Sequence, residues 1–443
     1  MNRTRGLTRA GLAFAGVTVL LAGAVGAAQP AAPALSPLER LGKSLFFDKI
    51  STPARSMSCA SCHAPQAGYV GAIAGSNLHG AVYRGAERTR FGDRKPPSST
   101  YASYSPVFHF DAATGEFVGG NFWDGRATGE RLGSPTAEQA LGPHLNPVEQ
   151  NMPGKQAVCE HVRRSSYAPL FEQVYGRASL DCSVGGVDLT YDRFGLAMGA
   201  FQASVEVSPF SSRFDAYWRA CMAAVADAEA CGTTELDELP LAEAKGVLDP
   251  GGILTDQEFA GLLEFGEYCS ACHVSHEPGP HGGPPLFTNH RFSNIGVPKN
   301  PENPFYGMDD VYLDDGTPIN PLGADWVDRG LGAFLRTRVE WAGLAAANDG
   351  KFRVPTVRNV DKRPGAGFPK AYMHNGALKS LAEVVHFYNT RDVAAAGWPA
   401  PEVSANVNRD LFEGKPMGNF ELSAEAEASI VAFLRTLSDG YSP

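Results

Sequence analysis

Two short segments of the chain share one pattern, a pair of cysteines two residues apart followed directly by a histidine. Residues 59–63 read CASCH and residues 269–273 read CSACH. This spacing is typical of c-type haem attachment, in which both thiols bond to the haem and the histidine ring reaches the iron. The sequence therefore predicts two covalently bound c-type haems. The attachment residues are Cys59, Cys62, Cys269 and Cys272, and the axial iron ligands are His63 and His273.

Other interpretations of the two segments are a redox-active cysteine pair and half of a zinc site. The histidine directly after each pair disfavours the first, and no neighbouring Cys-x-x-Cys completes the second. The chain has only 8 Cys and 11 His in 443 residues, so two matches by chance are not expected.

The first 28 residues have the pattern of a cleaved export signal. Arg3, Arg5 and Arg9 precede an apolar run over 11–24, and small residues at 26–28 offer a cleavage site. The run is short for a membrane span, which needs about 20 residues. We therefore expect a signal peptide over 1–28, no membrane span in the mature form, and the periplasm as the location.

Charge and the remaining cysteines limit the partners and the compartment. The formal net charge is −10, which argues against nucleic acid and favours a basic protein partner. Four cysteines lie outside the haem motifs, and two disulfides are expected in an oxidising compartment. Chain order suggests Cys159–Cys182 and Cys221–Cys231, although four cysteines allow three connectivities.

A helix is predicted directly before each haem motif. Ser36 and Glu39 form one potential capping box, Thr255 and Glu258 form another, and apolar residues then recur at helical spacing. Because a helix leading into Cys-x-x-Cys-His begins a cytochrome c domain, we expect an internal duplication. The predicted fold is mostly α, with two cytochrome c-like haem domains over 29–240 and 241–443 and long loop insertions.

Three more helices and two loop regions are predicted. The helices cover 191–207, with Leu196 and Val205 on a packed face, the stretch after Ser380, and 425–437. Residues 64–121 and 274–330 are rich in Gly, Ser and Pro, so we expect loops there.

Residues 122–127 (FWDGRA) and 139–149 (QALGPHLNPVE) carry a family resemblance. With the two haem motifs, the chain resembles the bacterial di-haem cytochrome c peroxidases and their MauG relatives over its whole mature length. The resemblance implies that Trp123 lies between the haems, with a simple core aromatic as the alternative. It also implies that Gln139, Pro143 and Glu149 line the peroxide-reacting side of the first haem.

The chemistry of peroxide cleavage explains the acid in this set. A carboxylate held above the iron can move a proton from the near oxygen of peroxide to the departing one. An exposed surface acid is the alternative for Glu149. Some family members carry a distal histidine that leaves the iron on reduction, and His79, sixteen residues after His63, is a candidate beside the alternative of a solvated loop residue.

The second haem departs from the conventional family pattern. Residues 352–360 and 372–376 match the family, but fourteen residues after His374, where conventional members place an axial methionine, stands Tyr388. By resemblance, tyrosine at this position is typical of the MauG-like variant. A phenolate ligand stabilises ferric and higher oxidation states of the iron. Met417 is the main rival ligand, and Met373 and His386 are weaker ones.

The family resemblance implies further partners and a further cofactor. A calcium ion between the domains is common in the family. Lys95 stands where relatives have a ligating asparagine, so backbone carbonyls near Pro369 and Ala371 are the calcium ligands that could still contribute. A homodimer is also common among relatives, so the oligomeric state stays open.

The predicted function is a periplasmic peroxidase that reduces hydrogen peroxide at the His63 haem. The oxidising equivalents are shared with the second haem through Trp123 and used, as in MauG, to oxidise a partner protein. One alternative is a conventional cytochrome c peroxidase that detoxifies peroxide with electrons from a small cytochrome or cupredoxin. Another is a non-catalytic di-haem electron carrier, which would not need Glu149.

Overall fold

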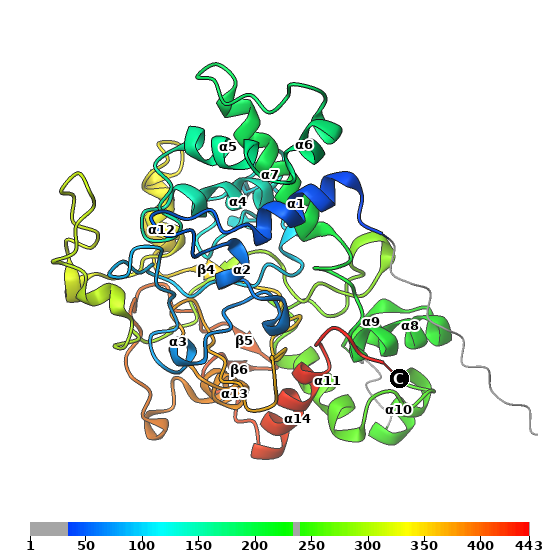
Figure 1. The fold of residues 1–443 in the computed structure, drawn as a ribbon. Helices are drawn as coiled ribbons and strands as arrows, with labels where there is room; N and C mark the ends of the chain where they lie inside the picture. Colours follow the sequence, from blue (N-terminus) through cyan, green and yellow to red (C-terminus); the bar gives the residue numbers. More distant parts are fainter. Residues whose placement is uncertain (1–33, 234–239, 443) are drawn as a thin grey trace, which may run out of the picture. The chain divides into compact units, whose positions relative to one another are not determined.

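The computed structural model describes residues 34–233 and 240–442, so the predicted signal peptide lies outside the described residues. From Leu35 onward the chain forms one compact unit (Figure 1). Within the described ranges no helix has the length and apolar character needed to cross a membrane.

Helices dominate the secondary structure, which confirms the predicted mostly α fold class. In the first half they are α1 (Pro37–Phe47), α2 (Cys59–Cys62), α3 (Ala74–Leu78), α4 (Pro135–Leu145), α5 (Lys155–Arg163), α6 (Ala168–Tyr175), α7 (Val187–Ala203), α8 (Arg213–Val225) and α9 (Ala228–Gly232). In the second half they are α10 (Leu241–Leu248), α11 (Asp256–Tyr268), α12 (Leu331–Leu335), α13 (Leu381–Thr390) and α14 (Ala424–Arg435).

Strands occur only as short antiparallel pairs in the described chain. They are β1 (His109–Asp111) with β2 (Glu116–Val118), β3 (Phe292–Ser293) with β4 (Phe352–Arg353), and β5 (Leu411–Phe412) with β6 (Lys415–Pro416). The pairing of β3 with β4 sets Phe292 opposite Arg353. This pair lies beside the second haem motif and contributes to its cavity.

The predicted capping boxes begin the two helices that lead to the haem motifs. Ser36 caps α1 with Glu39 closing the box, and Thr255 caps α11 with Glu258 closing the box. Each cap satisfies backbone N–H groups that a helix start would otherwise leave without partners. The two helix starts are therefore set by local sequence.

One packing contact recurs in the two halves. On α1, Gly42 lies so close to α7 that a Cβ would overlap the carbonyl oxygen of Ala197. On α11, Gly261 lies in the same way against the carbonyl oxygen of Ser429 on α14. Only glycine permits this backbone approach, so the same device seats each motif-bearing helix on a long partner helix.

The buried side chains form a core around each of these helix pairs. Leu41 and Phe194 belong to the first core, and Phe259 and Phe433 belong to the second. Helices α8 and α9 precede residue 240, yet Trp218 of α8 is buried in the second core. The domain division at 240/241 stays a prediction, and the packing of α8 shows that the second core draws on chain from before it.

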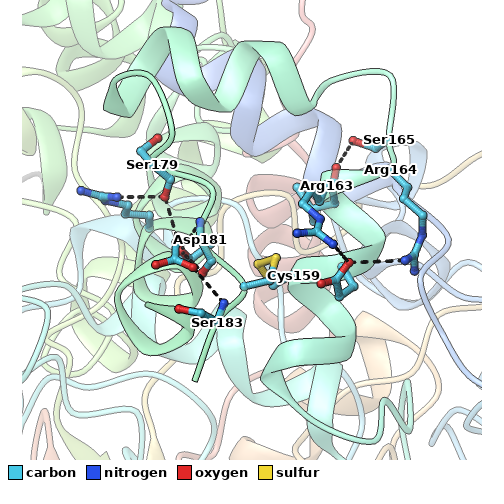
Figure 2. The surroundings of a disulfide bond; sticks show 12 residues. Cys159, Arg163, Arg164, Ser165, Ser179, Asp181 and Ser183 are labelled. Atoms are coloured by element: carbon cyan, nitrogen blue, oxygen red, sulfur yellow. Dashed lines mark hydrogen bonds and ion pairs between the residues drawn. A yellow bond between two sulfur atoms is a disulfide. The ribbon is translucent and has the colours of Figure 1, made fainter. Parts of the chain in front are cut away.

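Two disulfides join the four remaining cysteines in the order suggested by the sequence. Cys159 of α5 pairs with Cys182, and Cys221 of α8 pairs with Cys231 of α9. Figure 2 shows Cys159 on its helix, with Asp181 and Ser183 on the facing segment. Each bond closes a short loop within one half of the chain.

One helix prediction was partly wrong. Helix α7 covers Val187–Ala203 rather than 191–207, because Ser204 turns to an extended conformation. Val205 lies beyond the helix and is 40% exposed, and Leu196 is 37% exposed. The helix packs on α1 and α4, and neither residue lies on the face that these two helices cover.

Candidate active site

The first motif forms a single helical turn that holds its histidine ring in a fixed orientation. Cys59–Cys62 make up α2, and His63 caps its end. The Nδ1 atom of His63 lies 3.1 Å from the carbonyl oxygen of Tyr69 and 3.1 Å from Ser99 Oγ. With Nδ1 occupied, Nε2 is the nitrogen left for a metal, and burial lowers the pKa of His63, which favours the neutral, ligating form.

A cavity of about 470 Å³, including the part open to solvent, brings the first motif and the predicted peroxide-side residues together. Its lining includes Cys59, Cys62, His63, Gln139, Pro143 and Glu149. Helix α4 supplies Gln139 and Pro143 from successive turns, and Glu149 follows in the turn after the helix. Residues separated by about 80 positions in the sequence thus share one cavity.

Glu149 is held in place and kept from water. Asn146, the residue that ends α4, donates a hydrogen bond of 2.7 Å from Nδ2 to Glu149 Oε1. Burial raises the pKa of Glu149, against the opposing effect of the Arg126 charge. A carboxyl group positioned in this way can both accept and return a proton during a reaction.

His79 does not line this cavity. It follows α3, its side chain is 70% exposed, and Nδ1 lies 3.3 Å from Glu302. The structure therefore places His79 in the solvated-loop position that the sequence left as the alternative.

The second motif lines a larger and more apolar cavity of about 1460 Å³, including the part open to solvent. Cys269 ends α11, and Cys272 and His273 follow it on the cavity wall. His273 Nδ1 lies 3.2 Å from the carbonyl oxygen of Phe287, and burial lowers the pKa of His273. The imidazole has the same orientation device as His63, with Nε2 left for a metal.

Tyr388 and Met417 line this second cavity together. No described residue makes a hydrogen bond to the Tyr388 hydroxyl, and burial raises its pKa well above the ordinary value. Met417 is 3% exposed and lies after β6. Of the weaker candidates, Met373 also lines the cavity, whereas His386 is 49% exposed and pairs with Glu427 at 2.9 Å.

Trp123 lies on the wall of the second cavity and is connected to the first. Its Nε1 donates a hydrogen bond of 2.8 Å to the carbonyl oxygen of Lys95. Four residues along the chain, Ser99 contacts His63. A short path of one hydrogen bond, four peptide units and one side-chain contact thus joins the indole to the first histidine.

The donor sets fit two haems. Each cavity has a cysteine pair, a buried neutral histidine with its second nitrogen free, and a mainly apolar wall. The residues near the expected calcium position do not fit that ion. Lys95, a buried residue, brings a cationic side chain, and Asn77 Nδ2 donates a hydrogen bond of 3.0 Å to the carbonyl oxygen of Pro369.

Sequence reasoning missed the groups that act through tertiary contacts. Asn146 lies within the family-matching stretch 139–149, so its position three residues before Glu149 could have predicted their hydrogen bond. Ser99 carries no local signal, and Arg353, which lines the second cavity, lies in the family-matching stretch 352–360 that gave it no role. Their relevance follows only from what the fold brings beside them.

Comparison with known proteins supports a single family. The family described as di-haem cytochrome c peroxidase matches residues 36–221. The methylamine utilization protein MauG of Paracoccus denitrificans is 31% identical, and the match covers 95% of this chain and 93% of that protein. The cytochrome-c peroxidase IdrP1 of Denitromonas iodatirespirans is 25% identical, and the match covers 90% of this chain and 80% of that protein. The crystal structure of the diheme peroxidase BthA from Burkholderia thailandensis has a TM-score of 0.67 at 27% identity, covering 92% of this chain and 90% of that one.

Proposed function

The chain belongs to the di-haem cytochrome c peroxidase and MauG family and is a haem peroxidase, and from that premise we propose that it reduces hydrogen peroxide in the periplasm at a haem bound by His63. The second haem, held by His273 and Tyr388, shares the oxidising equivalents through Trp123. A partner protein supplies the electrons by oxidation of its own side chains.

The observation that carries this proposal is the shared cavity of His63 and Glu149. A haem attached there supplies the iron that binds and cleaves the peroxide. Glu149 takes the proton from the near oxygen and returns it to the departing one, and Asn146 holds the carboxyl group for this transfer. Gln139 and Pro143 line the same cavity as His63 and would limit the entry of water beside a bound haem.

The proposed ligand Tyr388 favours the MauG-like use of the oxidising equivalents. A phenolate beside the iron lowers the reduction potential, which suits storage of oxidising equivalents better than receipt of electrons from a cytochrome. Burial raises the pKa of Tyr388, so the phenolate would form only with a compensating cation such as a bound iron. The relative with the highest quoted identity is itself named for methylamine utilization.

A conventional peroxidase fed by a small cytochrome or cupredoxin is the second candidate. Met417 favours it, because this methionine lies in the same cavity as Tyr388. A di-haem electron carrier is less well supported, since Glu149 with its raised pKa has no task in a carrier.

The test is rapid mixing of the diferric protein with one equivalent of peroxide, followed by optical absorption. We expect prompt loss of the ferric haem bands without prior reduction, since His79 is turned to solvent. A requirement for prior reduction would favour the conventional peroxidase, and no reaction in any redox state would revive the carrier.

The variant Glu149→Gln isolates the acid in this test. It keeps the size and the contact with Asn146 but cannot carry the proton, so the rate constant should fall by about 10²–10⁴-fold. Glu425→Gln, an exposed acid in the first turn of α14, is the matched control and should react like the parent protein. An unchanged rate in Glu149→Gln would remove Glu149 from the mechanism.

A further inference from the structure

Arg353 is a buried cation without a counter-ion in the described chain. It is 8% exposed, and its backbone N–H donates a hydrogen bond of 2.8 Å to the carbonyl oxygen of Trp123. The side-chain Nε is buried and has no hydrogen-bond partner. Burial lowers the pKa of this guanidinium to about 10, with no nearby carboxylate to oppose the effect.

An unpaired buried guanidinium is costly, so the position of its side chain indicates where an anion belongs. Removing a charge from water costs several kcal/mol per ion unless a partner compensates. Arg353 lines the second cavity, so a partner bound in that cavity can reach this residue. By contrast Arg358, which is also buried, is paired with Asp215 at 2.8 Å.

A second buried polar group without a hydrogen-bond partner lies on the same wall. His374 Nε2 is buried without a hydrogen-bond partner, and burial lowers the pKa of His374 to about 4, so the ring is neutral. The ring stacks on Phe352 at 3.6 Å between centroids, and Phe352 is the neighbour of Arg353 in β4. A neutral imidazole held in this way can donate one hydrogen bond to an anion.

Two carboxyl groups line this wall, and neither pairs with Arg353 in the described chain. Asp328 is held by Arg94 through bonds of 2.6 and 2.7 Å. Glu402 accepts hydrogen bonds from Tyr306 and from the backbone of Asp328 through Oε1, while its Oε2 is buried without a hydrogen-bond partner and burial raises the pKa of the group. Neither acid neutralises Arg353, so the positive charge is left for a bound group.

We infer that Arg353, with His374 beside it, binds a propionate carboxylate of the second haem. A haem attached through its vinyl groups to Cys269 and Cys272 carries its two propionates on the opposite edge. Arg353 and His374 line the same cavity as the two cysteines, so a haem attached there could bring a propionate to them. Trp123, which is proposed to join the two haems, lines this cavity too, and its backbone carbonyl accepts the hydrogen bond from Arg353.

This inference rests on the proposed function only in requiring a haem in the second cavity. Arg353→Gln is the main test because the backbone hydrogen bond to Trp123 survives any side-chain change. Arg353→Lys keeps the charge but loses the two-pronged hydrogen bonding. Arg163→Gln, an exposed arginine at the end of α5, is the matched control.

The readouts are the midpoint potential of each haem by spectropotentiometry and the propionate bending mode in resonance Raman spectra. Loss of a positive charge favours the ferric form, so Arg353→Gln should raise the ferric to ferrous ratio of the second haem about tenfold, equivalent to about 59 mV for one electron. Arg353→Lys should keep most of the potential yet shift the bending mode. The first haem and the control should not change.

Two results would overturn the inference, and they differ from failure of the proposed function. An unchanged potential in Arg353→Gln would show that no propionate is bound there, and if that variant does not accumulate, an unchanged bending mode in Arg353→Lys has the same meaning. Parent protein that carries one covalent haem by mass spectrometry would instead refute the two-haem proposal itself.

Discussion

At the scale of single residues, we propose that the second ligand of the His273 haem decides how the protein uses its oxidising equivalents. Tyr388 and Met417 lie in one cavity, so distance along the chain does not choose between them. We expect Tyr388→Met to raise the midpoint potential of the second haem, since a thioether favours ferrous iron over a phenolate. Met417→Leu, a change of similar volume, should leave that potential in place.

Spectropotentiometry and near-infrared absorption of the ferric protein would check this pair. The phenolate-to-iron absorption should vanish in Tyr388→Met and persist in Met417→Leu. The reverse pattern would assign Met417 as the ligand and favour the conventional peroxidase.

The pH profile of the peroxide reaction is a second prediction at this scale. Burial raises the pKa of Glu149 above its ordinary value of 4.5. Because the ionised form accepts the proton, the rate constant should rise as pH increases through that raised pKa and then level off. Stopped-flow traces from acid to neutral pH would measure this rise of the rate constant, and Glu149→Gln should abolish the rise. If the variant kept the same pH dependence, the titrating group would be a residue other than Glu149.

Single residues could be predicted where the chemistry requires a residue type at a fixed spacing. Cys59, Cys62 and His63 are of this kind. His79 shows the limit, because an offset of sixteen residues through a loop does not say which way the ring points. Arg353 lies in a stretch that matches the family, but its lack of a counter-ion could not be predicted because it is visible only in three dimensions.

At the scale of elements, one carboxylate joins the end of α1 to α5 and α6. Asp48 Oδ2 lies 2.8 Å from His161 Nε2 and accepts a hydrogen bond from Tyr167. Burial alone would raise the pKa of Asp48, but these two partners outweigh it and lower the pKa below 3.8. This contact supports the helix that leads to Cys59.

The sign of the pH effect follows from the lowered pKa. The stabilisation is present above the unfolded pKa near 3.8 and is lost as pH falls through the folded value. We expect Asp48→Asn to lower the free energy of unfolding by about 1–2 kcal/mol at neutral pH and to flatten the acid limb. Urea unfolding at several pH values measures this free energy, and Asp188→Asn, at an exposed position, is the control. Equal losses of unfolding free energy in the two variants would contradict the prediction.

The starts of elements were more predictable than their ends. Ser36 and Thr255 act within three residues, so their capping boxes are encoded locally. The end of α7 at Ala203 depends on how the chain turns away after the helix leaves α1 and α4, and a periodic pattern does not contain that information.

At the scale of the whole molecule, the carboxyl-terminal segment joins parts of the chain that the sequence assigned to separate domains. Asp439 accepts hydrogen bonds from the Tyr101 hydroxyl, the Ser211 backbone and Asn359 Nδ2. Nearby, Lys370 donates to the carbonyl oxygens of Ala67 and Asn359. The repeat of two cytochrome c-like halves could be inferred from the motifs, but these long-range contacts could not.

Because such contacts cross residue 240, we expect the two halves to unfold together. Thermal unfolding followed separately at the bands of each haem should give one shared midpoint. Asp439→Ala leaves the buried Tyr101 hydroxyl without its acceptor and should lower that midpoint for the two haems by the same amount, with a loss of about 2–4 kcal/mol. The exposed variant Asp315→Ala should leave the midpoint in place. Two separate transitions, with Asp439→Ala moving only one, would mean that the halves are independent folding units and that coupling of the haems does not depend on this terminal contact.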